Sequence, residues 1–62
     1  MEPIRFVITK TDNGCKAKTD DKRATMSDRN LSYNGSIQDC IKMLSDKYNA
    51  RGYEVLFDIF GD

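Results

Sequence analysis

The residue types that carry catalytic chemistry are few in this 62-residue chain, and histidine is absent. Histidine is the commonest general base and the usual partner of a nucleophilic serine or cysteine. Cys15 lies beside Lys16, whose positive charge would favour a thiolate. Because free cysteine usually behaves as a small hydrophobic residue, we interpret both Cys15 and Cys40 as core residues. The composition therefore predicts a protein that is not an enzyme.

Acidic side chains are the next candidates, because carboxylates bind metal ions. Asp20 and Asp21 are adjacent in a polar stretch typical of a turn, and no third carboxylate is suitably spaced to complete a metal site with them. A second set falls at positions 1, 3, 5 and 12 of a calcium-binding loop: Asp28, Asn30, Ser32 and Asp39. Tyr33 occupies position 6, where that loop requires glycine, and position 12 lacks the longer glutamate. We expect neither a metal nor a cofactor.

Basic residues between positions 16 and 29 suggest contact with nucleic acid: Lys16, Lys18, Lys22, Arg23 and Arg29. A basic β-ribbon can follow a phosphate backbone. Against this, acidic residues are interleaved, the chain has ten basic and ten acidic residues, and no aromatic side chain lies among these cations to stack on a base. Nucleic-acid binding through these residues is therefore the alternative function rather than the first.

Length and cysteine content bound the class of protein. A chain of 62 residues predicts one compact domain over residues 1–62, with a core that supplies roughly 3–5 kcal/mol of stability. Two cysteines are too few for a disulfide framework, and nothing near Met1 resembles a secretory leader. No window approaches the roughly 18 apolar residues of a membrane span. We expect a cytoplasmic protein that does not contact membranes.

The clearest local pattern runs from Ser36 to Phe60. Apolar residues recur at helical spacing on one face: Ile37, Cys40, Ile41, Leu44 and Tyr48. Ser36 is a suitable N-cap, and Gly52 a suitable stop. From Tyr53 to Phe60, apolar residues then alternate with a mixed set, which is typical of a strand.

The N-terminal half predicts further strands. Ile4, Phe6 and Ile8 alternate with outward residues, and Asp12-Asn13-Gly14 favours a tight reversal with positive φ. A second strand should return over Cys15–Thr19, and either Arg23–Met26 or Asn30–Tyr33 supplies a short third strand. The prediction is an α+β fold of order β-β-(β)-α-β, with a small mixed sheet of three or four strands and one helix packed on one face. The helix should cover the first and last strands, including Val55, Phe57 and Ile59.

A single helix covers only one side of a sheet. The other side should expose three large apolar residues among charged ones: Val7, Leu56 and Phe60, with Arg5, Lys16, Lys18, Glu54 and Asp58. Apolar groups ringed by charge are typical of an interaction surface. We therefore predict a module that binds another protein through Val7, Leu56, Phe60, Arg5, Glu54 and Asp58, or by strand addition at an unpaired edge. The same edge could form a homodimer.

The layout also carries a resemblance. A hairpin, the helical segment 36–44 (SIQDCIKML) and a following strand resemble the layout of HicB-like antitoxins, whose small domain neutralises an RNase toxin, and of short phage-encoded inhibitors. The resemblance implies an inhibitor or regulator, encoded by a phage or another mobile element, that acts by protein contact.

Overall fold

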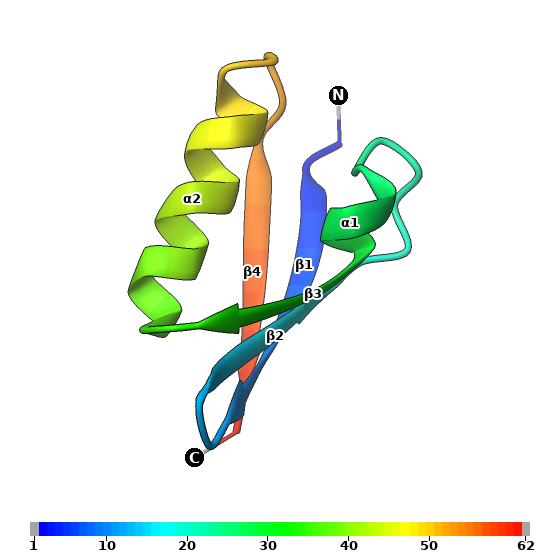
Figure 1. Ribbon diagram of the computed structural model, residues 1–62. Coiled ribbons are helices and arrows are strands. Elements are labelled where there is room, and N and C mark those ends of the chain that lie inside the picture. The colour runs from blue at the N-terminus through cyan, green and yellow to red at the C-terminus, as the bar shows by residue number, and fades with distance from the viewer. Residues whose placement is uncertain (1, 62) are drawn as a thin grey trace.

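The computed structural model describes residues 2–61 as a four-stranded sheet with one long and one short helix (Figure 1). The elements in chain order are β1 (Ile4–Thr11), β2 (Gly14–Lys18), α1 (Met26–Arg29), β3 (Asn30–Asn34), α2 (Ile37–Asn49) and β4 (Val55–Phe60). The strand order is β3-β2-β1-β4, with β4 parallel to β1 and the other two pairings antiparallel. The predicted α+β class, with a mixed sheet and one helix packed on one face, is confirmed.

The segment between β2 and β3 settles which residues form the third strand. Asn30–Asn34 pairs with β2, whereas residues 23–26 lead into the short helix α1, which the sequence patterns did not predict. The Asp21 carboxylate accepts a hydrogen bond from the backbone N–H of Arg23 at 2.9 Å, and such a local turn competes with strand pairing. The extended alternative at Arg23–Met26 is therefore wrong.

The hydrophobic core lies between α2 and the two central strands. Its fully buried members come from three elements, β1, β2 and α2, and from one loop: Ile4, Phe6, Ile8, Cys15, Ala17, Ala24, Cys40, Leu44 and Tyr48. Phe6 is central, because its ring lies 5.9 Å from the ring of Tyr48 on α2 and 5.9 Å from that of Phe57 on β4. The core thus links β1 to α2 and to β4 through one aromatic side chain.

The β1–β2 hairpin turns where the sequence predicted, but for a different reason. Thr11 pairs with Gly14 across the two-residue loop Asp12-Asn13. Among residues 2–61, positive φ occurs only at Gly35, Gly52 and Gly61, so the expectation of positive φ in this turn was wrong. Gly14 is required for space, since a Cβ there would overlap the backbone carbonyl oxygen of Tyr33 on β3.

Ile59 departs from its predicted environment. It pairs with the buried Ile8 and so lies on the helix side of the sheet, yet its side chain is 53% exposed. The C-terminal end of β4 extends past the first turn of α2 (Figure 1), and β4 is an edge strand. Alternation predicts the face of a residue but not whether a helix reaches it, so the expected burial of Ile59 was wrong.

The helix face gives the first testable prediction. Leu44 is fully buried, and Leu44→Ala should lower the free energy of unfolding by about 2–5 kcal/mol. Because the whole domain supplies only roughly 3–5 kcal/mol, we expect the variant to be mostly unfolded at 25 °C by circular dichroism. Met43→Ala is the matched control, since Met43 on the same helix is 40% exposed. A cooperative, native-like melt of Leu44→Ala would contradict the assignment of the buried face.

Candidate functional site

The candidate site is the side of the sheet opposite α2, which we call the open face. It is formed by alternate residues of the strands: Arg5, Val7 and Thr9 of β1, Lys16 and Lys18 of β2, Asn30 and Ser32 of β3, and Leu56, Asp58 and Phe60 of β4. All of them are exposed. No other element among residues 2–61 covers this surface, because the chain has one long helix and its apolar face packs on the opposite side.

Three apolar side chains form the centre of the open face. Val7, Leu56 and Phe60 are 36%, 46% and 57% exposed. Val7 lies opposite Asp58 in the parallel pairing of β1 and β4, so Leu56 and Phe60 are its diagonal neighbours. Large side chains reach one another across such diagonals. The sheet therefore brings together the three apolar residues that the sequence predicted for the site.

Charges on the open face are divided between the strands. Asp58 lies on β4, and Glu54 precedes that strand, whereas Lys16 and Lys18 lie on β2. Arg5 lies between them on β1, and its Nε is 3.8 Å from Oδ2 of Asp58. Both side chains are at least half exposed, so this pair contributes little to stability. The open face is consequently acidic at β4 and basic at β2, on either side of the apolar centre.

A shallow hollow adjoins Val7 at one end of the open face. It has a volume of about 470 Å³ and is lined by Arg5, Val7, Lys18, Thr19, Asp20 and Arg29. Three of these side chains are cationic and one is anionic. The hollow therefore extends the candidate surface from the apolar centre toward the end of β2.

The five basic residues of the predicted nucleic-acid site do not form one cluster. Lys16 and Lys18 lie on the open face, and Lys22 is exposed in the loop that follows β2. Arg23 is bound within the fold, since it donates to the Asp21 carboxylate at 2.6 Å and to the backbone carbonyl of Glu2 at 2.7 Å. Arg29 likewise donates to the backbone carbonyls of residues 22 and 24.

The ion pair of Arg23 also changes the acidity of its partner. Hydrogen bonds from the side chain and backbone of Arg23 lower the pKa of Asp21 from 3.8 to about 2. Asp21 is therefore ionised across the physiological range, and its hydrogen bonds with Arg23 hold the loop between β2 and α1 in place.

A buried carboxylate that the sequence patterns considered only as a calcium ligand connects α1 to α2. Asp28 is only 5% exposed, and its Oδ2 accepts hydrogen bonds from Lys47 Nζ at 2.6 Å, the Tyr48 hydroxyl at 2.6 Å and the Thr25 hydroxyl at 2.9 Å. The Tyr48 hydroxyl accepts in turn from the backbone N–H of Thr25 at 3.0 Å. The only signal in the sequence was the Thr25-x-x-Asp28 spacing, which is typical of a helix start.

The environment of Asp28 keeps it charged. Burial alone would raise its pKa, but the hydrogen bonds from Lys47, Tyr48 and Thr25 outweigh burial, so the pKa of Asp28 lies below its ordinary value. A buried charge that is fully hydrogen-bonded fixes the position of the elements that bind it. Asp28 therefore holds α1, and with it the start of β3, against the C-terminal half of α2.

The two cysteines are free and buried. The pKa of the Cys40 thiol is raised to about 12, mainly by burial and secondly by its contact with Cys15. A thiol that stays protonated is a poor nucleophile, so the geometry agrees with the interpretation of Cys40 as a core residue.

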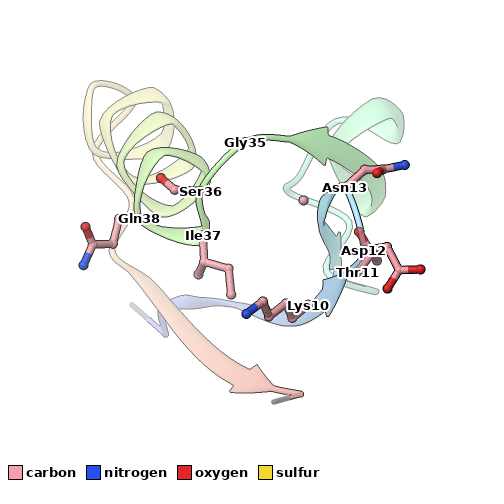
Figure 2. A pocket seen from close by; sticks show the side chains of 9 residues that line it. Lys10, Thr11, Asp12, Asn13, Gly35, Ser36, Ile37 and Gln38 are labelled. Carbon is pink, nitrogen blue, oxygen red and sulfur yellow. The ribbon is translucent and has the colours of Figure 1, made fainter.

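A second hollow, of about 520 Å³, lies between the β1–β2 turn and the start of α2. Figure 2 shows Lys10 and Ile37 pointing toward each other across it, whereas Gln38 points away. Ser36, at the helix start, already accepts a hydrogen bond from the backbone N–H of Asp39 at 3.1 Å. The residues that line this hollow carry one ammonium group, that of Lys10, and one carboxylate, that of Asp12. None of them is a cysteine or a histidine.

Within residues 2–61, no three cysteine, aspartate or glutamate side chains are grouped so that they could hold a metal ion. None of the helices in this part of the chain has the length and apolar character needed to cross a bilayer. No family model, curated protein or solved structure matches the chain significantly.

The Asp28 network predicts a pH-dependent stability. Because folding lowers the pKa of Asp28 from 3.8, its contribution is complete above that pH and is lost as the pH falls through the folded-state pKa. The free energy of unfolding should therefore decrease as the pH is lowered below about 4. Asp28→Asn should lower the free energy of unfolding by about 1–3 kcal/mol near pH 7. The free energy of unfolding of this variant should also fall less steeply than that of the wild type as the pH is lowered.

Urea unfolding between pH 2 and pH 7 measures both effects. Asp46→Asn is the matched control, since Asp46 lies on α2 and is exposed; it should keep the wild-type stability and slope. An Asp28→Asn protein with an unchanged acid slope would show that the network does not stabilise the fold.

Proposed function

We propose that this protein is a small non-enzymatic binding module that inhibits or regulates another protein by occupying its surface. The observation that carries this proposal is the exposure of Val7, Leu56 and Phe60 together on the uncovered side of the sheet. Exposed apolar groups that gather on one surface, with a charged rim, are typical of protein interfaces. Large side chains such as Phe60 and Leu56 can supply much of the binding energy once a partner excludes water from them.

The charges around the apolar centre support a protein partner. Asp58 and Glu54 on one side and Lys16 and Lys18 on the other would restrict the orientation of a bound surface, since complementary charges give specificity. We place this activity in the cytoplasm, because Cys15 and Cys40 are free thiols in the fold and such thiols persist in a reducing compartment. An origin in a phage or mobile element belongs to the same proposal.

Charge substitution on the open face tests the proposal. Leu56→Asp and Phe60→Asp should each abolish binding while the fold survives, because both side chains are exposed and a buried, unpaired carboxylate in an interface is costly. The measurement is affinity purification of the tagged protein from its native host, followed by calorimetry with the recovered partner. Met26→Asp is the matched control, since Met26 is 82% exposed and lies on α1. If both open-face variants bind like the wild type, the assigned surface is wrong.

Nucleic-acid binding is the second candidate, and one observation favours it. Lys16 lies opposite Thr9, which in turn lies opposite Phe60, so a cation and an aromatic ring share one row across the open face. Single-stranded nucleic acids bind to sheets that combine cations with stacking side chains. Lys18 lies beside this row on the same face.

A salt titration tests this second candidate. If the open face binds RNA or DNA, Lys16→Gln with Lys18→Gln should lower the slope of log K against log salt by about 2, because each lysine would neutralise one phosphate. The measurement is fluorescence anisotropy of a labelled oligonucleotide, beginning at low salt. Lys10→Gln with Lys42→Gln removes the same charge from residues outside the open face and should leave the slope unchanged. No binding at low salt would exclude this function.

A further inference from the structure

The outer edge of β4 is unpaired within residues 2–61, because β4 is the last strand of the sheet. The backbone N–H of Ile4 donates to the carbonyl of Glu54 at 2.8 Å, so the peptide groups of Glu54 and of alternate residues after it face β1. Successive residues in a strand direct their backbone groups to opposite sides. The N–H and C=O groups of Val55, Phe57 and Ile59 therefore point away from the sheet.

This edge lacks most of the features that normally prevent strand pairing. Proteins protect edges with proline, charged side chains such as lysine, bulges or very short strands, and of these β4 has one charged residue, Asp58. β4 has the sequence VLFDIF, spans six residues and pairs without interruption from Val55 to Phe60. The opposite edge, β3, differs, because its exposed residues are polar: Asn30, Ser32 and Asn34. Of the two edges, β4 is the one suited to accept another strand.

Side chains on both sides of β4 indicate what such a strand must carry. On the helix side, Val55 and Phe57 are half-buried and Ile59 is 53% exposed, so apolar side chains opposite them would complete the core. On the other side, Glu54 and Asp58 are exposed. Among residues 2–61 Asp58 has one ion pair, a 3.8 Å contact with the exposed Arg5, and β4 itself carries no cation. Side chains directly opposite each other on neighbouring strands stabilise the pair when their charges are opposite.

We propose that β4 accepts an extended segment of a partner protein as a fifth, antiparallel strand. That segment carries lysine or arginine opposite Glu54 and Asp58 and apolar residues opposite Val55, Phe57 and Ile59. The proposal rests on the proposed protein-binding function and specifies its mode, which is backbone pairing at the edge combined with charge recognition on the open face. Antiparallel pairing is the more stable geometry per residue.

A second copy of this chain fits the edge less well. Two β4 strands related by a twofold axis must pair residues of the same face, so the axis passes through a single residue. The two registers that pair most of β4 place the axis at Phe57 or at Asp58. In the first case each Asp58 is diagonal to both Asp58 and Glu54 of the other copy. In the second case the two Asp58 side chains are directly opposite. The second register places like charges directly opposite, which destabilises the pairing, and the first places them at the longer diagonal distance.

Synthetic peptides test the charge requirement. The probe is the heptapeptide TVKVTVK with blocked ends, whose lysines fall opposite Asp58 and Glu54 in the antiparallel register. The matched control, TVEVTVE, differs only in charge and should bind about tenfold more weakly. The readout is amide hydrogen exchange by NMR on the wild-type protein. The amides of Val55, Phe57 and Ile59 should gain protection with TVKVTVK, whereas those of β3 should not.

Proline substitution tests the backbone requirement. Because the N–H of Ile59 points away from β1, Ile59→Pro should leave the fold intact, as proline is tolerated at outward-facing edge positions, and should abolish peptide binding. Ile59→Thr removes the same apolar side chain but keeps the N–H, so it should retain binding. Cooperative melting verifies that both variants fold, and the exchange experiment on the wild type decides the question should the proline variant unfold.

Several results would overturn the inference. Equal binding of the two peptides would remove the charge requirement, and an absence of protection at Val55, Phe57 and Ile59 would remove the strand. Protection of these amides in the peptide-free protein, together with a dimer in sedimentation, would assign the edge to a second copy. If a natural partner no longer binds Leu56→Asp but still binds Ile59→Pro, strand addition fails while the proposed binding function stands.

Discussion

The structure depends on one constraint: a single long helix covers one side of a four-stranded sheet. The apolar face of α2, with the buried Cys40, Leu44 and Tyr48, packs on β1, β2 and β4. No further helix in residues 2–61 remains to cover the other side. Val7, Leu56 and Phe60 are therefore exposed by the architecture itself, and the same arrangement leaves β4 at the edge of the sheet. The candidate surface and the candidate edge have a common origin.

The exposed surface needs a rigid support, and two interactions provide it. Phe6 joins β1 to α2 and β4 through its contacts with Tyr48 and Phe57. The Asp28 carboxylate joins α1 to α2 through Lys47 and Tyr48. Tyr48 takes part in both, with its ring in the core and its hydroxyl in the polar network. Binding by a preorganised surface loses less conformational entropy than binding by a mobile one, so this support favours the function that we propose.

Sequence patterns predicted the elements better than their surroundings. The helix from Ile37 and the outward direction of Val7, Leu56 and Phe60 followed from periodicity. Ile59 was assigned to the core because alternation specifies a face, whereas burial depends on how far α2 extends along β4. The Asp28 network was missed because it joins residues 19 and 20 positions apart, a separation that no local pattern reports. Periodicity could not choose between the two candidate third strands, because the choice depends on the side-chain turn at Asp21.

The central claim is that the face of Val7, Leu56 and Phe60 is open to solvent in the free protein. Paramagnetic relaxation of side-chain methyl groups by a dissolved gadolinium chelate measures this directly. If the face is open, the methyl groups of Val7 and Leu56 relax strongly, comparably to the exposed Met26, whereas those of the buried Ile4 and Leu44 relax weakly. Weak relaxation at Val7 and Leu56 would show that another surface already covers this face, and the face would not be open.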